Sequence, residues 1–172
     1  ESRRRAATQI AVGALRYFML KYTRNSVIAF DFGEALSFEG ETGPYVQYAA
    51  MRAQKILAKL AERGMEMPDF VTTLDQGAFG RQLANEDLWQ LLLAASKNDA
   101  AVDRAVTSGE PSHVARYAFQ LAQAFSNFYQ KYPVIAEQDP EKRTFLLWMT
   151  QYFRSQLERT LDVLGIEVPE YM

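Results

Sequence analysis

The hydrophobic positions along most of the chain recur every three or four residues, which is the spacing of an amphipathic α-helix. The pattern is clearest in a stretch that opens at Pro44 and closes before Gly64. Proline suits the first turn of a helix, and glycine is common just after the last one. This stretch therefore predicts a helix of about 20 residues, roughly 30 Å long at 1.5 Å per residue.

The same pattern predicts further helices on both sides of this one. Asn85 and Asp139 are good N-cap residues, because their side-chain oxygens can accept hydrogen bonds from the free N–H groups of a first turn. Gly109 and Gly165 follow periodic stretches and favour helix ends there. The additional helices expected from these signals cover residues 5–22, 85–96, 99–107, 112–132 and 140–164.

Three stretches lack the helical pattern. Residues 27–32 form a short β-branched and aromatic run, which favours an extended segment. Residues 33–43 and 65–84 contain several glycines and favour irregular connections, and the second also allows short helical turns. The predicted fold is therefore all-α: a bundle of five or six helices, preceded by a helix and a short extended segment.

Composition excludes several kinds of site. The chain has 172 residues, 48% of them hydrophobic and 23% charged, which is typical of a globular domain. It contains no cysteine, so disulfides, thiolate catalysis and Cys-based zinc sites are excluded. Its single histidine, His113, excludes sites that need two. We expect no metal site and no catalytic residue, because no P-loop, GxGxxG, GxSxG or HExxH motif is present.

Acidic pairs such as Glu39/Glu41 and Asp99/Asp103 are more typical of a solvated face than of acid–base chemistry, and His113 of a surface or capping side chain. No apolar run is long enough to span a membrane, and the first residues lack the apolar core of a signal peptide. These features predict a cytoplasmic protein without a membrane partner. The chain starts without methionine, which favours a piece of something longer, although a tag or processing would also explain the missing start.

Charge is distributed unevenly. The total is −2, yet residues 1–24 carry six basic groups against one acidic group, whereas residues 25–50 carry four acidic groups and no basic one. The helix that opens at Pro44 is basic towards its end. A near-neutral total can therefore hide local positive faces, which is what a nearby nucleic acid would experience.

Aromatic and basic side chains share one face of that helix. Tyr45, Tyr48 and Arg52 are spaced i, i+3, i+7, which places them on one side. Two rings and a guanidinium could stack bases and hold phosphate, although the spacing alone also fits tyrosines at the edge of a core. In the helix at 112–132, Phe119 and Tyr129 lie ten positions apart, so at least one of them is expected to leave the core stripe.

Three stretches together resemble the class I arginyl-tRNA synthetases. FEGETGPYVQYAAMRAQKIL at 38–57 is similar to the family's G-x-TGPYxQYAxxR segment, and PSHVARYAFQLAQAFSNFYQKYPVI at 111–135 is similar to its aromatic helix. The ending LDVLGIEVPEYM at 161–172 is similar to the family's C-terminus. The upstream stretch at 12–32 fits the segment that follows the family's KMSKS loop, so the resemblance covers nearly the whole chain in the family's order.

This resemblance implies a C-terminal piece of an arginine–tRNA ligase. Residues 1–43 would be the end of the catalytic domain and contact the tRNA stem, and residues 44–172 would be the helical DALR-type anticodon-binding domain. The parent enzyme joins arginine to its tRNA with ATP and magnesium. The HIGH and KMSKS signatures are absent from this sequence, so the chain itself would bind tRNA, with no cofactor, and would not activate arginine.

The family's anticodon contacts carry over to six positions. The resemblance implies that the chain binds arginine tRNA and not DNA. It also implies that the chain contacts the catalytic half of the same protein and works as a monomer. The implied residues are Tyr45, Tyr48, Arg52, Phe119, Tyr129 and Met172.

One departure is that Tyr171 stands where the family often has arginine, which puts a phosphate contact there in question. A local basic strip is expected to supply further affinity, with the candidates Arg52, Lys55, Lys59, Arg63 and Arg116. Two other readings stay open: a stand-alone hydrolase or transferase, against which the absent motifs argue, and a helical protein-interaction domain that kept the fold without binding RNA.

Overall fold

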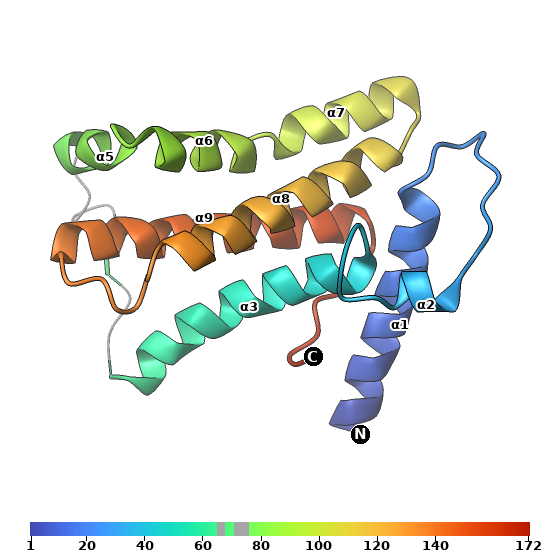
Figure 1. The fold of residues 1–172 in the computed structure, drawn as a ribbon, viewed down its shortest axis with the longest axis horizontal. Helices are drawn as coiled ribbons and strands as arrows, with labels where there is room; N and C mark the ends of the chain where they lie inside the picture. The colour runs from blue at the N-terminus through green and yellow to red at the C-terminus, as the bar shows by residue number, and fades with distance from the viewer. Residues whose placement is uncertain (65–67, 71–75) are drawn as a thin grey trace.

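The computed structural model describes residues 1–172 except 65–67 and 71–75. Helices dominate the part described, and no strand occurs in it, so the predicted all-α class is confirmed (Figure 1). In chain order the helices are α1 (Ser2–Leu20), α2 (Phe32–Ala35), α3 (Gly43–Glu62), α5 (Gln76–Leu83), α6 (Glu86–Ala95), α7 (Asn98–Ser108), α8 (Ser112–Lys131) and α9 (Pro140–Val163).

Short-range chemistry explains where the main helices begin and end. The side chain of Asn85 accepts hydrogen bonds from the backbone of Asp87 and Leu88, and that of Asp139 accepts from Glu141 and Lys142. These caps satisfy N–H groups that have no partner inside the helix. Glycines with positive φ, which other residues rarely adopt, follow α3, α7 and α9 at positions 64, 109 and 165.

The core lies where α3, α8 and α9 meet. The apolar side of α8 places Phe125 and Phe128 against Phe153 of α9, with ring centroids 5.7 and 5.6 Å apart. Helices α5, α6 and α7 lie along the other side of α8 and α9 in Figure 1. Three long helices therefore form the rigid frame on which the exposed side chains are presented.

Helix α1 crosses the start of α3 rather than running alongside the bundle (Figure 1). Its Tyr17 is fully buried, and the hydroxyl donates a 2.8 Å hydrogen bond to the carbonyl of Ala115 in α8. The buried amide of Gln47 in α3 donates to the carbonyl oxygens of Gln9 in α1 and Glu167 in the tail, at 3.0 and 2.8 Å. Helix α1 and the C-terminal tail are thus both held by α3.

The run at 27–32 lies outside the helices up to Asp31, whose backbone is extended, as the sequence predicts. It pairs with no strand in the described structure, and its last residue begins α2, capped by Asp31. The ring of Phe30 packs edge-on against Phe18 of α1 and Phe32, at 5.0 and 4.9 Å. Contact with the ring of Phe18 in α1 therefore holds this segment against the helix. The connection expected at 65–84 lies partly outside the described residues, and its described end is mostly α5.

Candidate nucleic-acid interface

The predicted face of α3 meets α8 along an exposed seam. The ring of Tyr45 lies 5.4 Å from that of Phe119 in α8, tilted by 56°. The guanidinium carbon of Arg52 lies 4.2 Å from the ring centroid of Tyr129 in α8 and 6.0 Å from that of Tyr48. The fold therefore brings five of the six predicted residues together from two helices, and we call these five the seam cluster.

The members of the seam cluster differ in exposure. Tyr48 is 40% exposed, whereas Tyr45, Arg52, Phe119 and Tyr129 are half-buried. The expectation that at least one of Phe119 and Tyr129 leaves the core is confirmed, because both lie at its margin. Tyr129 also rests on the buried ring of Phe125, with centroids 6.5 Å apart and planes 26° from parallel. Packing beneath the cluster thus holds the outer rings in place.

Arg52 gives the seam cluster its charge. It makes no ion pair with any described residue, and its guanidinium lies over two rings instead. Attraction between a cation and an aromatic face orients such a group without neutralising it. The arrangement can stack a planar base on a ring and direct N–H donors at a phosphate or at a base edge.

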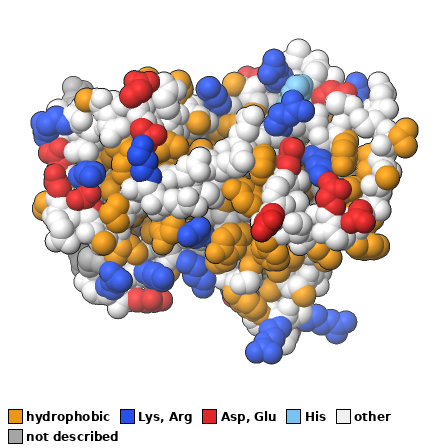
Figure 2. Space-filling view, viewed as in Figure 1, with side chains coloured by type: hydrophobic (Ala, Val, Ile, Leu, Met, Phe, Trp, Pro, Cys, Tyr) orange, Lys and Arg blue, Asp and Glu red, His pale blue; other side chains and the backbone are white. Residues whose placement is uncertain are grey.

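Basic side chains continue from the seam cluster along α3. Lys55 and Lys59 are exposed and follow Arg52 at spacings of three and seven residues, and exposed Arg63 comes just after the helix. Figure 2 shows Lys and Arg side chains gathered over this part of the molecule. Four of the five strip candidates are therefore placed in a row by one helix.

Arg116 does not belong to that row. It lies near the start of α8 and lines a groove with Lys97 and Arg104 of α7 and with His113. Helical spacing explains the row on α3, but the sequence does not show which helix lies beside the first turn of α8. The strip expected from the sequence is thus divided between two places.

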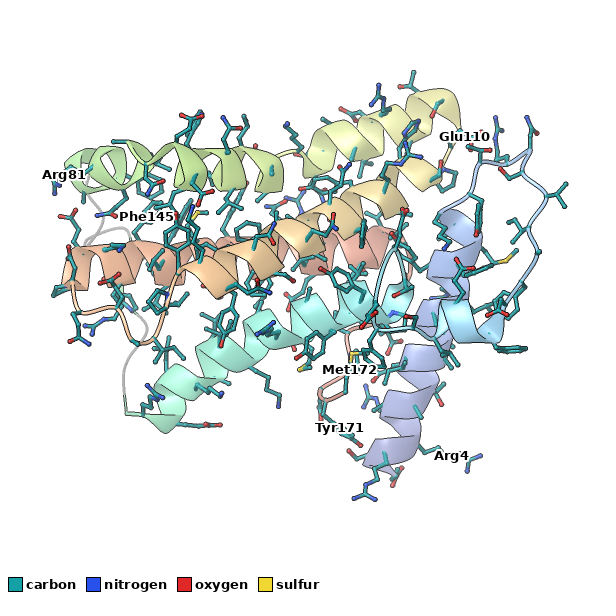
Figure 3. All side chains as sticks on the ribbon, in the orientation of Figure 1. Arg4, Arg81, Glu110, Phe145, Tyr171 and Met172 are labelled. Atoms are coloured by element: carbon teal, nitrogen blue, oxygen red, sulfur yellow. The ribbon has the colours of Figure 1, made fainter. Side chains whose placement is uncertain are left out.

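Met172 ends the tail and is half-buried; Figure 3 shows it beside α3. The tail is anchored through Gln47, which lies about 160° around α3 from Tyr45 at 100° per residue. Tyr171, at the position where arginine was expected, pairs its hydroxyl with that of Ser2 in α1 at 3.0 Å. The tyrosine therefore ties the tail to α1, and a role of Met172 beside the cluster stays a prediction.

Sequence reasoning did not single out Ser126. Its hydroxyl lies 3.5 Å from that of Tyr45, at the limit of a hydrogen bond, and it follows Phe119 by two turns of α8. That seven-residue spacing is the signal that places it on the same side of the helix. Ser126 adds a small polar group to the floor of the seam.

The other candidate residues show no constellation for catalysis. Asp99 is exposed and paired with Arg159 at 3.1 Å, and Glu41 is the acceptor of a long contact from the Tyr17 hydroxyl. Among the residues described, no group of three acidic or histidine side chains could hold a metal ion. No helix in the described ranges is long and apolar enough to cross a membrane.

Comparison with known proteins shows the family to which the chain is similar. The family model described as the DALR anticodon binding domain matches residues 46–172. The chain is 39% identical over 166 residues to the arginine–tRNA ligase of Hyphomonas neptunium, covering 96% of this chain and 26% of that protein. It is 36% identical over 171 residues to the ligase of Latilactobacillus sakei, covering 99% of this chain and 28% of the relative.

A solved structure shows the same arrangement of helices. The arginyl-tRNA synthetase of Thermus thermophilus superimposes with a TM-score of 0.76 at 31% identity, over 95% of this chain and 27% of that one. The chain thus spans about a quarter of the length of the relatives it matches. With the family model covering most of the sequence, including all of α8 and α3 from residue 46 onwards, the chain belongs to the DALR anticodon binding domain family.

Proposed function

We propose that this chain binds the anticodon loop of arginine tRNA through the seam cluster. The observation that carries the proposal is the convergence of Tyr45, Tyr48 and Arg52 of α3 with Phe119 and Tyr129 of α8 at one exposed seam. Unpaired bases are recognised by stacking on such rings and by hydrogen bonds to their edges. Met172, at the end of the tail, would complete the site.

The proposed role of each side chain follows from how exposed it is. Tyr48 presents the most open ring and would stack a base, a contact worth roughly 1–3 kcal/mol. Arg52, oriented by Tyr129, would donate to a base edge or phosphate. Lys55, Lys59 and Arg63 would contact phosphates beyond the loop, and that contribution would fall as salt rises.

The proposal extends to the longer protein by way of its relatives. They carry the name arginine–tRNA ligase, so the whole protein would attach arginine to tRNA with ATP and magnesium in the cytoplasm. This chain lacks the HIGH and KMSKS signatures, so activation would fall to the catalytic half. Residues 1–43 would belong to that half and residues 44–172 to the anticodon-binding domain, working as a monomer.

The test is binding of a labelled arginine anticodon stem-loop to the wild-type chain and to the double variant Tyr48→Ala/Arg52→Gln. We expect the double variant to bind about 10- to 100-fold more weakly, because one stacked base and one charged contact are lost. The wild type should also prefer this stem-loop over one with a changed middle anticodon base. A salt series separates the stacking contribution from the phosphate contribution.

The matched control is Trp89→Ala/Arg159→Gln, which removes a ring exposed to a similar extent, 42%, and one exposed arginine away from the seam. It should leave the affinity within about 2-fold of wild type. Thermal unfolding of both variants shows that the fold is kept. Equal affinity of the seam variant and the control would contradict the assignment and favour a helical protein-interaction domain.

A further inference from the structure

A groove between α7 and the start of α8 gathers positive charge away from the seam cluster. Lys97 is the N-cap residue of α7 and Arg104 lies within that helix, and His113 and Arg116 come from α8. The three Lys and Arg side chains are exposed, and His113 is half-buried. We call these four residues the basic groove. The small side chains of Ala100 and Ala101 also line it.

The two sides of α7 carry opposite charges. Lys97, Ala101 and Arg104 repeat at four and three residues and lie on the side that faces α8. Asp99 and Asp103 lie on the side that faces α9, where Asp99 pairs with Arg159. The acidic side chains of this helix therefore do not line the basic groove.

Glu110, three residues before His113 of the groove, is engaged elsewhere. Glu110 pairs with Arg24 at 3.4 Å and also accepts from the Arg24 backbone. Within the described structure, none of the four groove residues forms an ion pair. Exposed, unpaired cations on both walls of one groove are suited to an extended polyanion rather than to an internal structural role.

An uncharged polar track connects the groove with the seam cluster. Gln120, which also lines the groove, is followed along the exposed side of α8 by Gln123, Asn127 and Gln130. Helix α8 contains no acidic residue. In Figure 2 a band with few acidic side chains runs over α8, between the basic side chains beside the histidine and those over α3. RNA could lie along this band without facing a carboxylate from α8.

The polar track is long enough to lie beside several phosphates of a nucleic-acid duplex. Thirteen residues of α8 separate Arg116 from Tyr129, which is about 20 Å at 1.5 Å per residue. A duplex presents on the order of ten phosphates over that distance. A groove this far from the loop-binding seam would meet the paired stem rather than the unpaired bases of the loop.

We propose that the basic groove binds the phosphodiester backbone of the tRNA anticodon stem, while the amides of α8 lie beneath the RNA between groove and seam. This assignment rests on the proposed anticodon function. It adds a second contact, which is made to backbone phosphates and does not depend on the identity of the bases. The groove would therefore fix the direction in which the stem leaves the anticodon site.

The test compares two RNAs: the complete anticodon stem-loop, and the loop sequence alone as a short single strand. In Arg104→Gln/Arg116→Gln, we expect stem-loop affinity to fall about 10-fold at low salt and the log–log salt slope to shrink by about two. Affinity for the loop strand should not change. Lys97→Gln, a single change at an exposed position, should shrink the slope by about one.

The matched control is Arg81→Gln/Arg159→Gln, which removes the same charge at two exposed ion pairs outside the groove. It should leave both affinities near wild type. If the groove variant behaves like this control, or weakens both RNAs equally, the groove assignment is wrong. Inorganic phosphate at matched ionic strength should not displace the stem-loop, and displacement would mean a site for free phosphate instead.

Failure of the groove and failure of the anticodon proposal give different patterns. A groove variant indistinguishable from its control, together with weakened binding by Tyr48→Ala/Arg52→Gln, overturns only the groove. If the groove variant weakens stem-loop binding and Tyr48→Ala/Arg52→Gln does not, the groove assignment holds and the anticodon site is overturned. A wild-type chain that binds neither RNA at low salt overturns both.

Discussion

At the scale of single residues, two glycines decide how α1 crosses α3. A Cβ atom on Gly43 would lie 2.5 Å from the carbonyl oxygen of Gly13, and one on Gly13 would lie 2.5 Å from the amide nitrogen of Gln47. Backbone and buried amide occupy that space, so neither position has room for a methyl group. The close crossing in turn lets Gln47 reach the carbonyl oxygens of both α1 and the tail.

We expect Gly43→Ala to lower the free energy of unfolding by about 1–3 kcal/mol, the usual cost of overpacking a tight contact. Urea denaturation followed by circular dichroism measures it. The control is Gly80→Ala in α5, where a Cβ would meet nothing within 4 Å. That change should be neutral or stabilising by up to about 1 kcal/mol, because alanine favours a helix interior. Equal effects of the two substitutions would contradict the crossing geometry.

At the scale of elements, α6 is tied to the end of α8 by one carboxylate. The Tyr132 hydroxyl donates a 2.6 Å hydrogen bond to Asp87, and the Lys131 ammonium lies 2.9 Å from the same oxygen. The hydrogen bond from Tyr132 is the largest cause that lowers the pKa of Asp87, and the hydrogen bond from Lys131 is the next. Burial, together with the Asp87 contact, raises the pKa of Tyr132 to about 12.

A lowered carboxylate pKa stabilises the fold above the ordinary pKa of aspartate, near pH 4, and that stability is lost as pH falls through the folded-state value. Tyr132→Phe removes the main cause of the shift. We expect it to cost less than about 1 kcal/mol at pH 7, because the carboxylate is 42% exposed. The difference from wild type should shrink as pH falls below about 4.

Denaturation at a series of pH values measures this effect. Tyr22→Phe is the control, since its ring packs on Phe18 and its hydroxyl forms no hydrogen bond with another described residue. Its effect on stability should be independent of pH between about 2 and 7. A pH-independent cost of Tyr132→Phe would show that the hydrogen bond to Asp87 does not act through ionisation.

At the scale of the whole molecule, buried tyrosine hydroxyls join the outer helices to α8. Tyr17 of α1 donates to Ala115 in α8, and Tyr117 of α8 donates to Ala95 at the end of α6, each at 2.8 Å. Burial is the main reason that the pKa of each lies far above the ordinary value for tyrosine. Both hydroxyls stay protonated as long as the helices stay packed.

This predicts a cooperative alkaline transition. A group whose pKa is raised on folding contributes stability that is complete below its unfolded pKa, near 10, and is lost as pH rises towards the folded value. The two buried tyrosines, Tyr17 and Tyr117, should ionise together with the loss of helix. Tyrosinate absorbance and circular dichroism in the same titration check this, and gradual ionisation of all nine tyrosines before unfolding would contradict it.

Much of the fold could be predicted because its signals are local. The expected helices starting at Asn85 and Asp139 are confirmed by their caps, and the expected end at Gly165 by its positive φ. The run at 27–32 could not be placed, since a β-branched and aromatic pattern does not show whether its partner will be a strand or a helix. Arg116 was grouped with α3 for the same reason: charge is visible in a sequence, and the neighbouring helix is not.

The sequence by itself determined the all-α class, the helix starts and ends at its caps and glycines, and the shared face of Tyr45, Tyr48 and Arg52. Each of these depends on residues within two turns of one another, so spacing along the chain is enough. Only the tertiary structure decided that Tyr129 lies under Arg52 and that Arg116 faces α7. Those contacts depend on which helices pack together, and side-chain packing across the whole core selects that arrangement.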